Sequence, residues 1–231
     1  MRLGGVQKLT LLDFPEHVAC TVFTLGCNLR CPFCHNASLV VPERIGPEEM
    51  PEEAFFAFLE GRKKVLDGVA ITGGEPLLQP DIVEFIRKIR NRGFAVKLDT
   101  NGTLPHVLKP ILDEHLVDYV AMDVKNSPAR YGETVGVSGF DVKKVEESLA
   151  LLRASGIPFE LRTTVVAELH DEASIQELAA WIAGDQKYFL QSFTDSGDIL
   201  GSGFSAHTPE KMREFQRISA SFVPKTALRG I

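Results

Sequence analysis

The chain has 231 residues, of which 44% are hydrophobic and 24% are charged, and its formal net charge is −6 at pH 7. This length and apolar content predict a single domain over residues 1–231, and the negative charge argues against nonspecific binding to nucleic acid. No run reaches the ~18 apolar residues of a membrane helix, and the N-terminus has no apolar signal segment. We therefore expect a cytoplasmic protein with no membrane or nucleic-acid partner.

Short apolar runs alternate with longer segments that carry apolar residues at i, i+3 and i+4 spacing. Such runs predict strands, and such spacing predicts amphipathic helices. The expected strands are 17–24, 68–72, 94–99, 118–124, 159–166 and 188–193. The expected helices are 51–63, 80–93, 104–115, 141–152, 172–183 and 209–222. This order predicts an α/β fold with a parallel sheet, either an incomplete barrel or a doubly wound open sheet.

Three of the four cysteines, Cys27, Cys31 and Cys34, follow one another as C-x3-C-x2-C. Neighbouring thiolates can hold an iron–sulfur cluster, and a four-iron cluster on three cysteines would keep one iron open for a substrate or cofactor. A zinc site that includes His35 is an alternative, but adjacent Cys34 and His35 rarely face one ion. Sparse, bunched cysteines disfavour a disulfide framework. Cys20 lies in an expected strand, where a small buried thiol is the simplest interpretation.

With the aromatic Phe33 before the third cysteine, this segment resembles the signature of the radical S-adenosylmethionine (SAM) superfamily. The resemblance implies a partial (β/α)6 barrel and one [4Fe–4S] cluster on the three cysteines, held by a loop at 25–36. It also implies that SAM chelates the fourth iron, with Phe33 and His35 beside the cofactors. One electron would break a carbon–sulfur bond of SAM, and the resulting 5′-deoxyadenosyl radical would abstract a hydrogen atom.

Polar segments follow the second and third expected strands, at the ends where parallel α/β folds gather ligands. After the second strand, Gly73 and Gly74 allow the backbone to approach a ligand closely and to adopt positive φ angles. Asp99 and Thr100 resemble the strand end that lies near the ribose and methionyl group of SAM in activases of glycyl radical enzymes, where one relative also holds a monovalent cation. Alone, each segment is an ordinary turn. The segment after the second strand resembles the SAM-binding GGEP motif: Gly73, Gly74, Glu75 and Pro76.

Three charged residues lie in or after the later strands. Asp123 and Lys125 are two apart and face the same side, so Lys125 could clamp the SAM carboxylate, as in the D-x-K of activases, or form a solvated salt pair. Arg162 lies in an apolar strand and needs a partner, which could be SAM, a substrate peptide or a strand carboxylate. His170 and His207 have no pattern around them, and we expect both in loops or at the surface.

Residues 9–15, 18–28 and 34–36 resemble the activating enzymes of glycyl radical enzymes, most closely the anaerobic ribonucleoside-triphosphate reductase type. The resemblance implies an oxidoreductase that abstracts hydrogen from one glycine of a large partner protein. A one-electron reductant such as flavodoxin or ferredoxin would supply the electron. Pyruvate formate-lyase activases, which are near relatives, carry a His where this chain has residues 193–195. That difference puts specificity for pyruvate formate-lyase in doubt.

Two other functions stay open at this point. One is a radical SAM enzyme that acts on a small molecule or a short peptide. The other is a noncatalytic iron–sulfur or zinc binding module. Release of 5′-deoxyadenosine from SAM would separate an enzyme from such a module.

Overall fold

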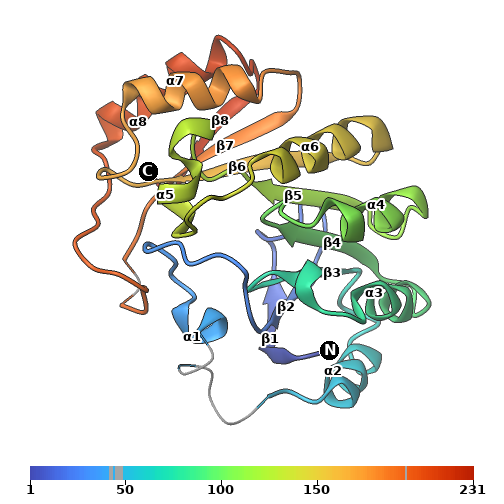
Figure 1. Cartoon of the computed structure of the whole chain (residues 1–231). Coiled ribbons are helices and arrows are strands. Elements are labelled where there is room, and N and C mark those ends of the chain that lie inside the picture. Colours follow the sequence, from blue (N-terminus) through green and yellow to red (C-terminus); the bar gives the residue numbers. More distant parts are fainter. Residues whose placement is uncertain (42–43, 45–48, 196) are drawn as a thin grey trace. The chain divides into compact units, whose positions relative to one another are not determined.

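The computed structural model describes residues 1–41, 44, 49–195 and 197–231. Strands and helices alternate along the chain, as an α/β fold requires (Figure 1). None of the helices in these ranges is long and apolar enough to cross a membrane.

The structure gives bounds for every element within those ranges. The strands are β1 (Leu3–Thr10), β2 (Ala19–Thr24), β3 (Gly68–Gly73), β4 (Ala95–Thr100), β5 (Tyr119–Asp123), β6 (Phe159–Val165), β7 (Lys187–Ser192) and β8 (Thr226–Arg229). The α-helices are α1 (Ala37–Val40), α2 (Glu52–Glu60), α3 (Ile82–Arg90), α4 (Pro105–Asp113), α5 (Tyr131–Val135), α6 (Lys143–Ser155), α7 (Glu172–Trp181) and α8 (Pro209–Ala220). Two single-turn 3₁₀ helices are η1 (Pro76–Leu78) and η2 (Pro128–Arg130).

Every expected strand and helix is present, with ends that lie within three residues of the expectation. The sequence reasoning missed β1 and β8, together with the short helices α1 and α5. β1 has only two buried residues and two adjacent glycines, so it lacks the apolar run that marked the other strands. β8 has only four residues, too few for a periodic pattern.

The chain divides into two compact units, which are described separately. The first contains Met1–Asn28, Ser38–Ala121 and Lys144–Pro158, and the second contains Leu29–Ala37, Met122–Lys143 and Phe159–Ile231. Both units are discontinuous in sequence, because the cysteine loop and β5 each pass from one unit to the other. A single domain over residues 1–231 stays a prediction.

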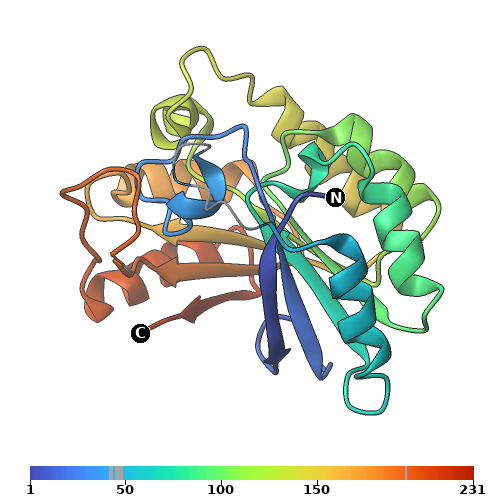
Figure 2. The ribbon, with the colours of Figure 1, turned by 90° about the horizontal axis from the view of Figure 1, so that it is seen from below.

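In the first unit, β2, β3 and β4 are parallel neighbours, and β1 pairs with β2 in the antiparallel direction (Figure 2). The predicted apolar stripe of α3 is buried, and Phe85 stacks on Phe55 of α2 with ring centroids 5.4 Å apart. Because the three parallel strands start and end in register, their carboxyl ends reach the same edge. Residues 24, 73 and 100 end β2, β3 and β4 there.

In the second unit, β6, β7 and β8 are parallel neighbours. Tyr188 of β7 is fully buried, and its hydroxyl lies 2.9 Å from the Thr163 hydroxyl of β6. Helix α7 begins with a capping box, in which the Asp171 side chain accepts from the Ser174 amide at 2.8 Å and the Ser174 hydroxyl accepts from the Asp171 amide. These contacts join β7 to β6 and fix the start of α7.

Candidate active site

The two glycines at the end of β3, Gly73 and Gly74, are required by the backbone that precedes the first cysteine. Gly73 has a φ of +113°, and a Cβ at this position would lie 2.4 Å from the Thr24 amide nitrogen. A Cβ on Gly74 would lie 1.9 Å from the carbonyl oxygen of Gly26, which is far inside any permitted contact. The close approach predicted from these glycines is therefore present, but the neighbour shown is the protein's own chain next to Cys27.

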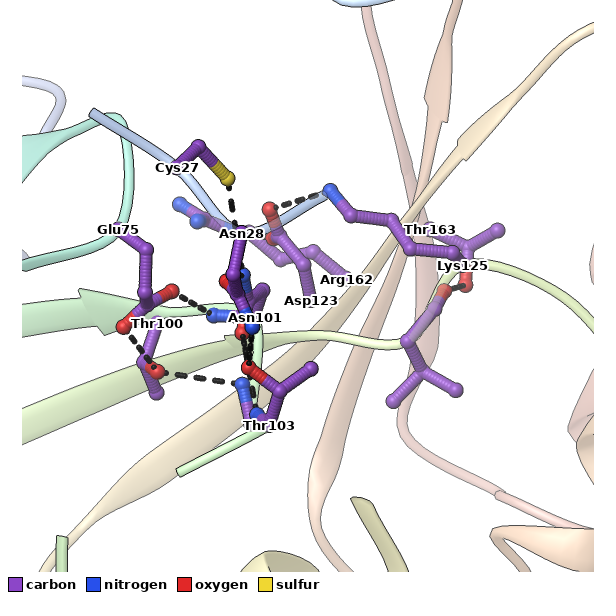
Figure 3. A network of polar contacts seen from close by, with 12 residues as sticks. Cys27, Asn28, Glu75, Thr100, Asn101, Thr103, Asp123, Lys125, Arg162 and Thr163 are labelled. Atoms are coloured by element: carbon purple, nitrogen blue, oxygen red, sulfur yellow. Dashed lines mark hydrogen bonds and ion pairs between the residues drawn. The ribbon is translucent and has the colours of Figure 1, made fainter. Parts of the chain in front are cut away.

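Glu75 fastens this turn to the end of β4. Its side chain is completely buried, and its amide donates to the Gly26 carbonyl at 2.8 Å. One carboxylate oxygen accepts from the Thr100 hydroxyl at 2.8 Å, and the other accepts from the Asn101 amide at 2.7 Å (Figure 3). The carboxylate also caps η1, which begins at the buried Pro76. Thus Glu75, Pro76 and Thr100, all predicted site residues, lie together in the first unit.

Asn101, which the sequence analysis did not select, faces Cys27. Its side-chain amide nitrogen lies 3.8 Å from the Cys27 sulfur and donates to the Asn28 side-chain oxygen at 3.0 Å (Figure 3). Its side-chain oxygen accepts from the Thr103 amide at 3.0 Å and from the Thr103 hydroxyl at 2.6 Å. Only the neighbouring Thr100 and the Asn-Gly turn signalled this residue in the sequence.

Asp99, another predicted site residue, is half-buried on β4 and bonds to the ammonium of Lys97. The Lys97 side chain is only 3% exposed, so the two charges neutralise each other on one face of the strand. Sequence reasoning missed Lys97, although a lysine inside an apolar strand is a usable signal. A monovalent cation near Asp99 would compete with this ammonium, and its presence stays a prediction.

The charged residues of the second unit form one group around Asp123. Lys125 donates to one oxygen of the Asp123 carboxylate at 2.9 Å, and the Arg162 guanidinium donates to the other at 2.8 Å (Figure 3). Arg162 and Thr164 are half-buried whereas Leu161 and Thr163 are buried, which confirms the predicted alternation. Arg162 therefore has a carboxylate partner on a neighbouring strand, which was one of the outcomes left open.

Burial and charge act in opposite directions on this group. Burial alone would raise the pKa of Asp123, but the Arg162 and Lys125 charges outweigh it and hold the pKa well below its ordinary value. Burial would lower the pKa of Lys125, but the Asp123 carboxylate outweighs it and raises the pKa. The aspartate is therefore anionic and the lysine cationic at neutral pH. Two cations and one carboxylate leave one net positive charge.

His170 lies in a loop, one of the two expected alternatives, but it is buried. Only 1% of the residue is exposed, and burial lowers the pKa of its imidazole to about 4. Its Nδ1 accepts from the Val166 amide at 3.1 Å, so its Nε2 donates to the Lys125 carbonyl at 2.8 Å. The ring thereby holds the backbone of Lys125. His207, in a loop as expected, is half-buried, and its Nε2 donates to the His170 carbonyl at 2.8 Å.

The cysteine loop belongs to both units, with Cys27 in the first and the other two cysteines in the second. Cys31 is 8% exposed, while Cys27 and Cys34 are half-buried, and none of the three is in a disulfide. The Cys34 amide donates to the Cys31 carbonyl at 3.0 Å, which forms a tight turn. Phe33 is buried and His35 is exposed.

The chemistry of this loop fits an iron–sulfur cluster. Three thiols outside disulfides are of the kind that binds such a cluster, the Asn101 amide faces Cys27, and the positive charge of Lys125 interacts with Cys31. The described residues contain no group of three His, Cys, Asp or Glu side chains placed to hold a single metal ion. Cys20 differs from the loop cysteines, because it is fully buried and burial raises the pKa of its thiol to about 12, which confirms a structural thiol.

The profile of the Radical SAM superfamily matches residues 21–182, a range that includes the cysteine loop, the GGEP turn, most of β2, and β3 to β6. The chain belongs to the radical SAM superfamily. Radical SAM proteins use a [4Fe–4S] cluster and SAM, so both cofactor predictions are confirmed. The chain is a radical SAM enzyme, and the noncatalytic module is set aside.

Two curated relatives are similar along most of this radical SAM chain. A protein of Methanocaldococcus jannaschii, provisionally named a glycyl-radical enzyme activating enzyme, is 31% identical over 99% of the chain and 96% of the relative. The 7-carboxy-7-deazaguanine synthase of Methanopyrus kandleri is 31% identical over 72% of the chain and 81% of the relative. The first relative confirms the predicted resemblance to activating enzymes.

A solved structure supports the fold of the radical SAM chain. The radical SAM methyltransferase from Sphaerobacter thermophilus matches with a TM-score of 0.72 and 15% identity, over 94% of this chain and 67% of that one. At this identity the likeness concerns the fold alone. It confirms the predicted fold class, the partial (β/α)6 barrel type of radical SAM proteins.

Proposed function

We propose that this radical SAM enzyme is an activase that abstracts a hydrogen atom from one glycine of a partner glycyl radical enzyme. The observation that carries the proposal is the similarity to an activating enzyme over 99% of the chain. We further propose that the partner is an anaerobic ribonucleoside-triphosphate reductase, since residues 9–15 and 18–28 resemble that type of activase. A one-electron reductant of the flavodoxin or ferredoxin class would supply electrons.

The thiolates of Cys27, Cys31 and Cys34 would hold the [4Fe–4S] cluster. When bound, the cluster and SAM together supply a carbon radical strong enough to abstract hydrogen. The protein's task is to position SAM and to keep the reactive group away from solvent. The buried Glu75 carboxylate supports this task, since it fixes the GGEP turn and the end of β4 through three hydrogen bonds that it accepts.

The SAM carboxylate would bind the charged group around Asp123. The net positive charge of this group suits a carboxylate. Lys125 would act as the point-charge clamp on the SAM carboxylate, while Arg162 supports Asp123. His170 would hold the Lys125 backbone through its hydrogen bond to the carbonyl. A glycine on the partner suits hydrogen abstraction, because the flanking amides delocalise the product radical and no side chain blocks access.

The test is anaerobic reconstitution of the full chain with iron, sulfide, SAM and a one-electron reductant, in the presence of the candidate reductase. We expect an electron paramagnetic resonance signal from a glycyl radical on the partner, coupled to SAM cleavage. A partner whose reactive glycine is replaced by alanine is the matched negative control. Cys27→Ala, Cys31→Ala and Cys34→Ala should each lose the cluster and the signal, whereas Cys20→Ala should keep both.

The similarity to a 7-carboxy-7-deazaguanine synthase defines the competing outcome, a small-molecule enzyme. Rapid multiple turnover to 7-carboxy-7-deazaguanine or another small product, with no protein radical on any cognate partner, would overturn the activase proposal. Slow SAM cleavage alone and faster cleavage with the partner would support it. Retention of the cluster by a Cys27→Ala variant would overturn the ligand assignment.

A further inference from the structure

Asn101 contacts three residues of the first unit: Glu75 in the GGEP turn, and Cys27 and Asn28 in the cysteine loop. Its backbone amide donates to the Glu75 carboxylate at 2.7 Å. Its side-chain nitrogen bonds to Asn28 and faces the Cys27 sulfur at 3.8 Å, within reach of a hydrogen bond to the large sulfur atom. One residue thus touches the carboxylate of the GGEP turn through its main chain and the first cysteine through its side chain.

The orientation of the Asn101 amide follows from its neighbours. The Thr103 backbone amide can only donate, and it points at one end of the Asn101 side chain at 3.0 Å. That end must therefore be the oxygen, and the NH2 group must be the end that faces Cys27. The reverse orientation would place two donors against each other at Thr103, so the assignment does not depend on the cysteine.

A closed ring of side-chain hydrogen bonds holds this orientation. Asn101 donates to Asn28, Asn28 donates to the Thr103 hydroxyl at 2.8 Å, and that hydroxyl donates to Asn101 at 2.6 Å. Asn101 is 6% exposed and Thr103 is 2% exposed, so solvent competes little for the bonds between these two residues, whereas Asn28 is exposed. The second hydrogen of the Asn101 NH2 group is the one directed at the sulfur.

We propose that Asn101 is a positioning residue that donates a hydrogen bond to the Cys27 sulfur and so raises the reduction potential of the cluster. When an external one-electron reductant adds an electron, the cluster and its thiolates gain one negative charge. A fixed N–H dipole stabilises that charge, as hydrogen bonds to sulfur do generally in iron–sulfur proteins. The inference rests on the proposed function, since it requires the cluster on Cys27.

The experiment compares the midpoint potential of the reconstituted wild-type chain with that of Asn101→Asp, without SAM, by a redox titration followed by electron paramagnetic resonance. The substitution keeps the size but replaces the NH2 donor with an acceptor. We expect unchanged iron and sulfide content in Asn101→Asp. The ratio of reduced to oxidised cluster at a fixed potential should be about tenfold lower, which corresponds to a midpoint potential lowered by about 59 mV for one electron. Asn91→Asp, on an exposed residue after α3, is the control for added charge.

A second pair of variants leaves Asn101 in place. Thr103→Val removes one of the two hydrogen bonds that hold the Asn101 side-chain oxygen and should lower the potential in the same direction by a smaller amount. Thr103→Ser keeps the hydroxyl and should keep the wild-type potential. This pair decides the question where Asn101→Asp does not load iron. Equal potentials in loaded wild type, Asn101→Asp and Thr103→Val would overturn the inference alone. Failure of the wild-type chain to assemble a cluster would instead overturn the proposed function.

Discussion

The buried imidazole of His170 bonds to the backbone carbonyl of Lys125, the lysine that we propose binds SAM. Its folded-state pKa of about 4 lies below the ordinary value of 6.5, so the unfolded chain binds the proton more tightly. The stability contributed by neutral His170 is complete above pH 6.5 and is lost as the pH falls toward 4. The shift corresponds to about 3 kcal/mol between these limits.

We therefore expect His170→Gln to be less stable than wild type at pH 7, because the packing and hydrogen bonds of the ring are lost. On acidification from pH 7 to pH 4.5, the variant should lose less stability than wild type loses. Urea unfolding at both pH values measures the difference. His106→Gln, on an exposed histidine, is the control and should follow wild type. The same pH dependence in His170→Gln and wild type would show that His170 is not the group that titrates.

Lys125 offers a second test at the scale of one residue. Lys125→Ala should fold, because Arg162 still neutralises Asp123. A lost charge-assisted hydrogen bond costs about 1.5–3 kcal/mol, so SAM should bind about ten- to a hundredfold more weakly, as measured by anaerobic calorimetry on the reconstituted enzyme. Lys109→Ala, on an exposed pair with Asp113 in α4, is the matched control. Unchanged affinity would leave Lys125 as a structural salt pair only.

At the scale of elements, the turn after β3 and the loop after β2 hold each other in place. Gly74→Ala would push a methyl group against the Gly26 carbonyl, so either the turn or the start of the cysteine loop must move. We expect a loss of about 1–3 kcal/mol in unfolding free energy and weaker retention of iron. Gly61→Ala is the control, because a Cβ there meets only ordinary contacts at 3.6 Å. Normal stability and iron content in Gly74→Ala would contradict this packing.

The sequence predicted the elements whose burial repeats regularly. Six strands and six helices were found because apolar runs and stripes end at glycines, prolines and capping residues. β1 and β8 lacked such runs. The motif residues Glu75, Asp123 and Lys125 were selected because a resemblance to a known signature covered them, and their role in binding SAM stays a prediction.

The residues that were missed act through partners far away in the sequence. Asn101 reaches Cys27 across 74 positions, and His170 reaches Lys125 across 45 positions. No local pattern encodes such contacts, since they arise only when the strand ends are brought together. Lys97 could have been noticed as a charge in an apolar strand, but its Asp99 partner lies two residues away and reads as an ordinary strand-end pair.

At the scale of the whole molecule, cofactor binding should stabilise the folded chain. A ligand that binds only the folded state at 100 times its Kd adds about 2.7 kcal/mol. For a chain of this size, that gain corresponds to about 5–10 °C in the unfolding temperature. We expect SAM to produce this rise in the reconstituted enzyme, measured by anaerobic calorimetry. Cys34→Ala without a cluster should show little rise, and a full rise in that variant would mean that SAM binds independently of the cluster.

The ring of side chains around Asn101 also bears on how the protein ages. An asparagine followed by glycine is the pair most prone to spontaneous deamidation, because the next backbone nitrogen attacks the side-chain carbonyl carbon. Here the Gly102 amide donates to the Thr100 hydroxyl at 3.1 Å, and the Asn101 carbonyl is held by Thr103. The fold thereby engages the attacking nitrogen and fixes the orientation of the side-chain amide. Each unfolding event would expose the pair to a reaction that converts the donor facing Cys27 into an acceptor, so conformational stability also sets the chemical lifetime of this contact.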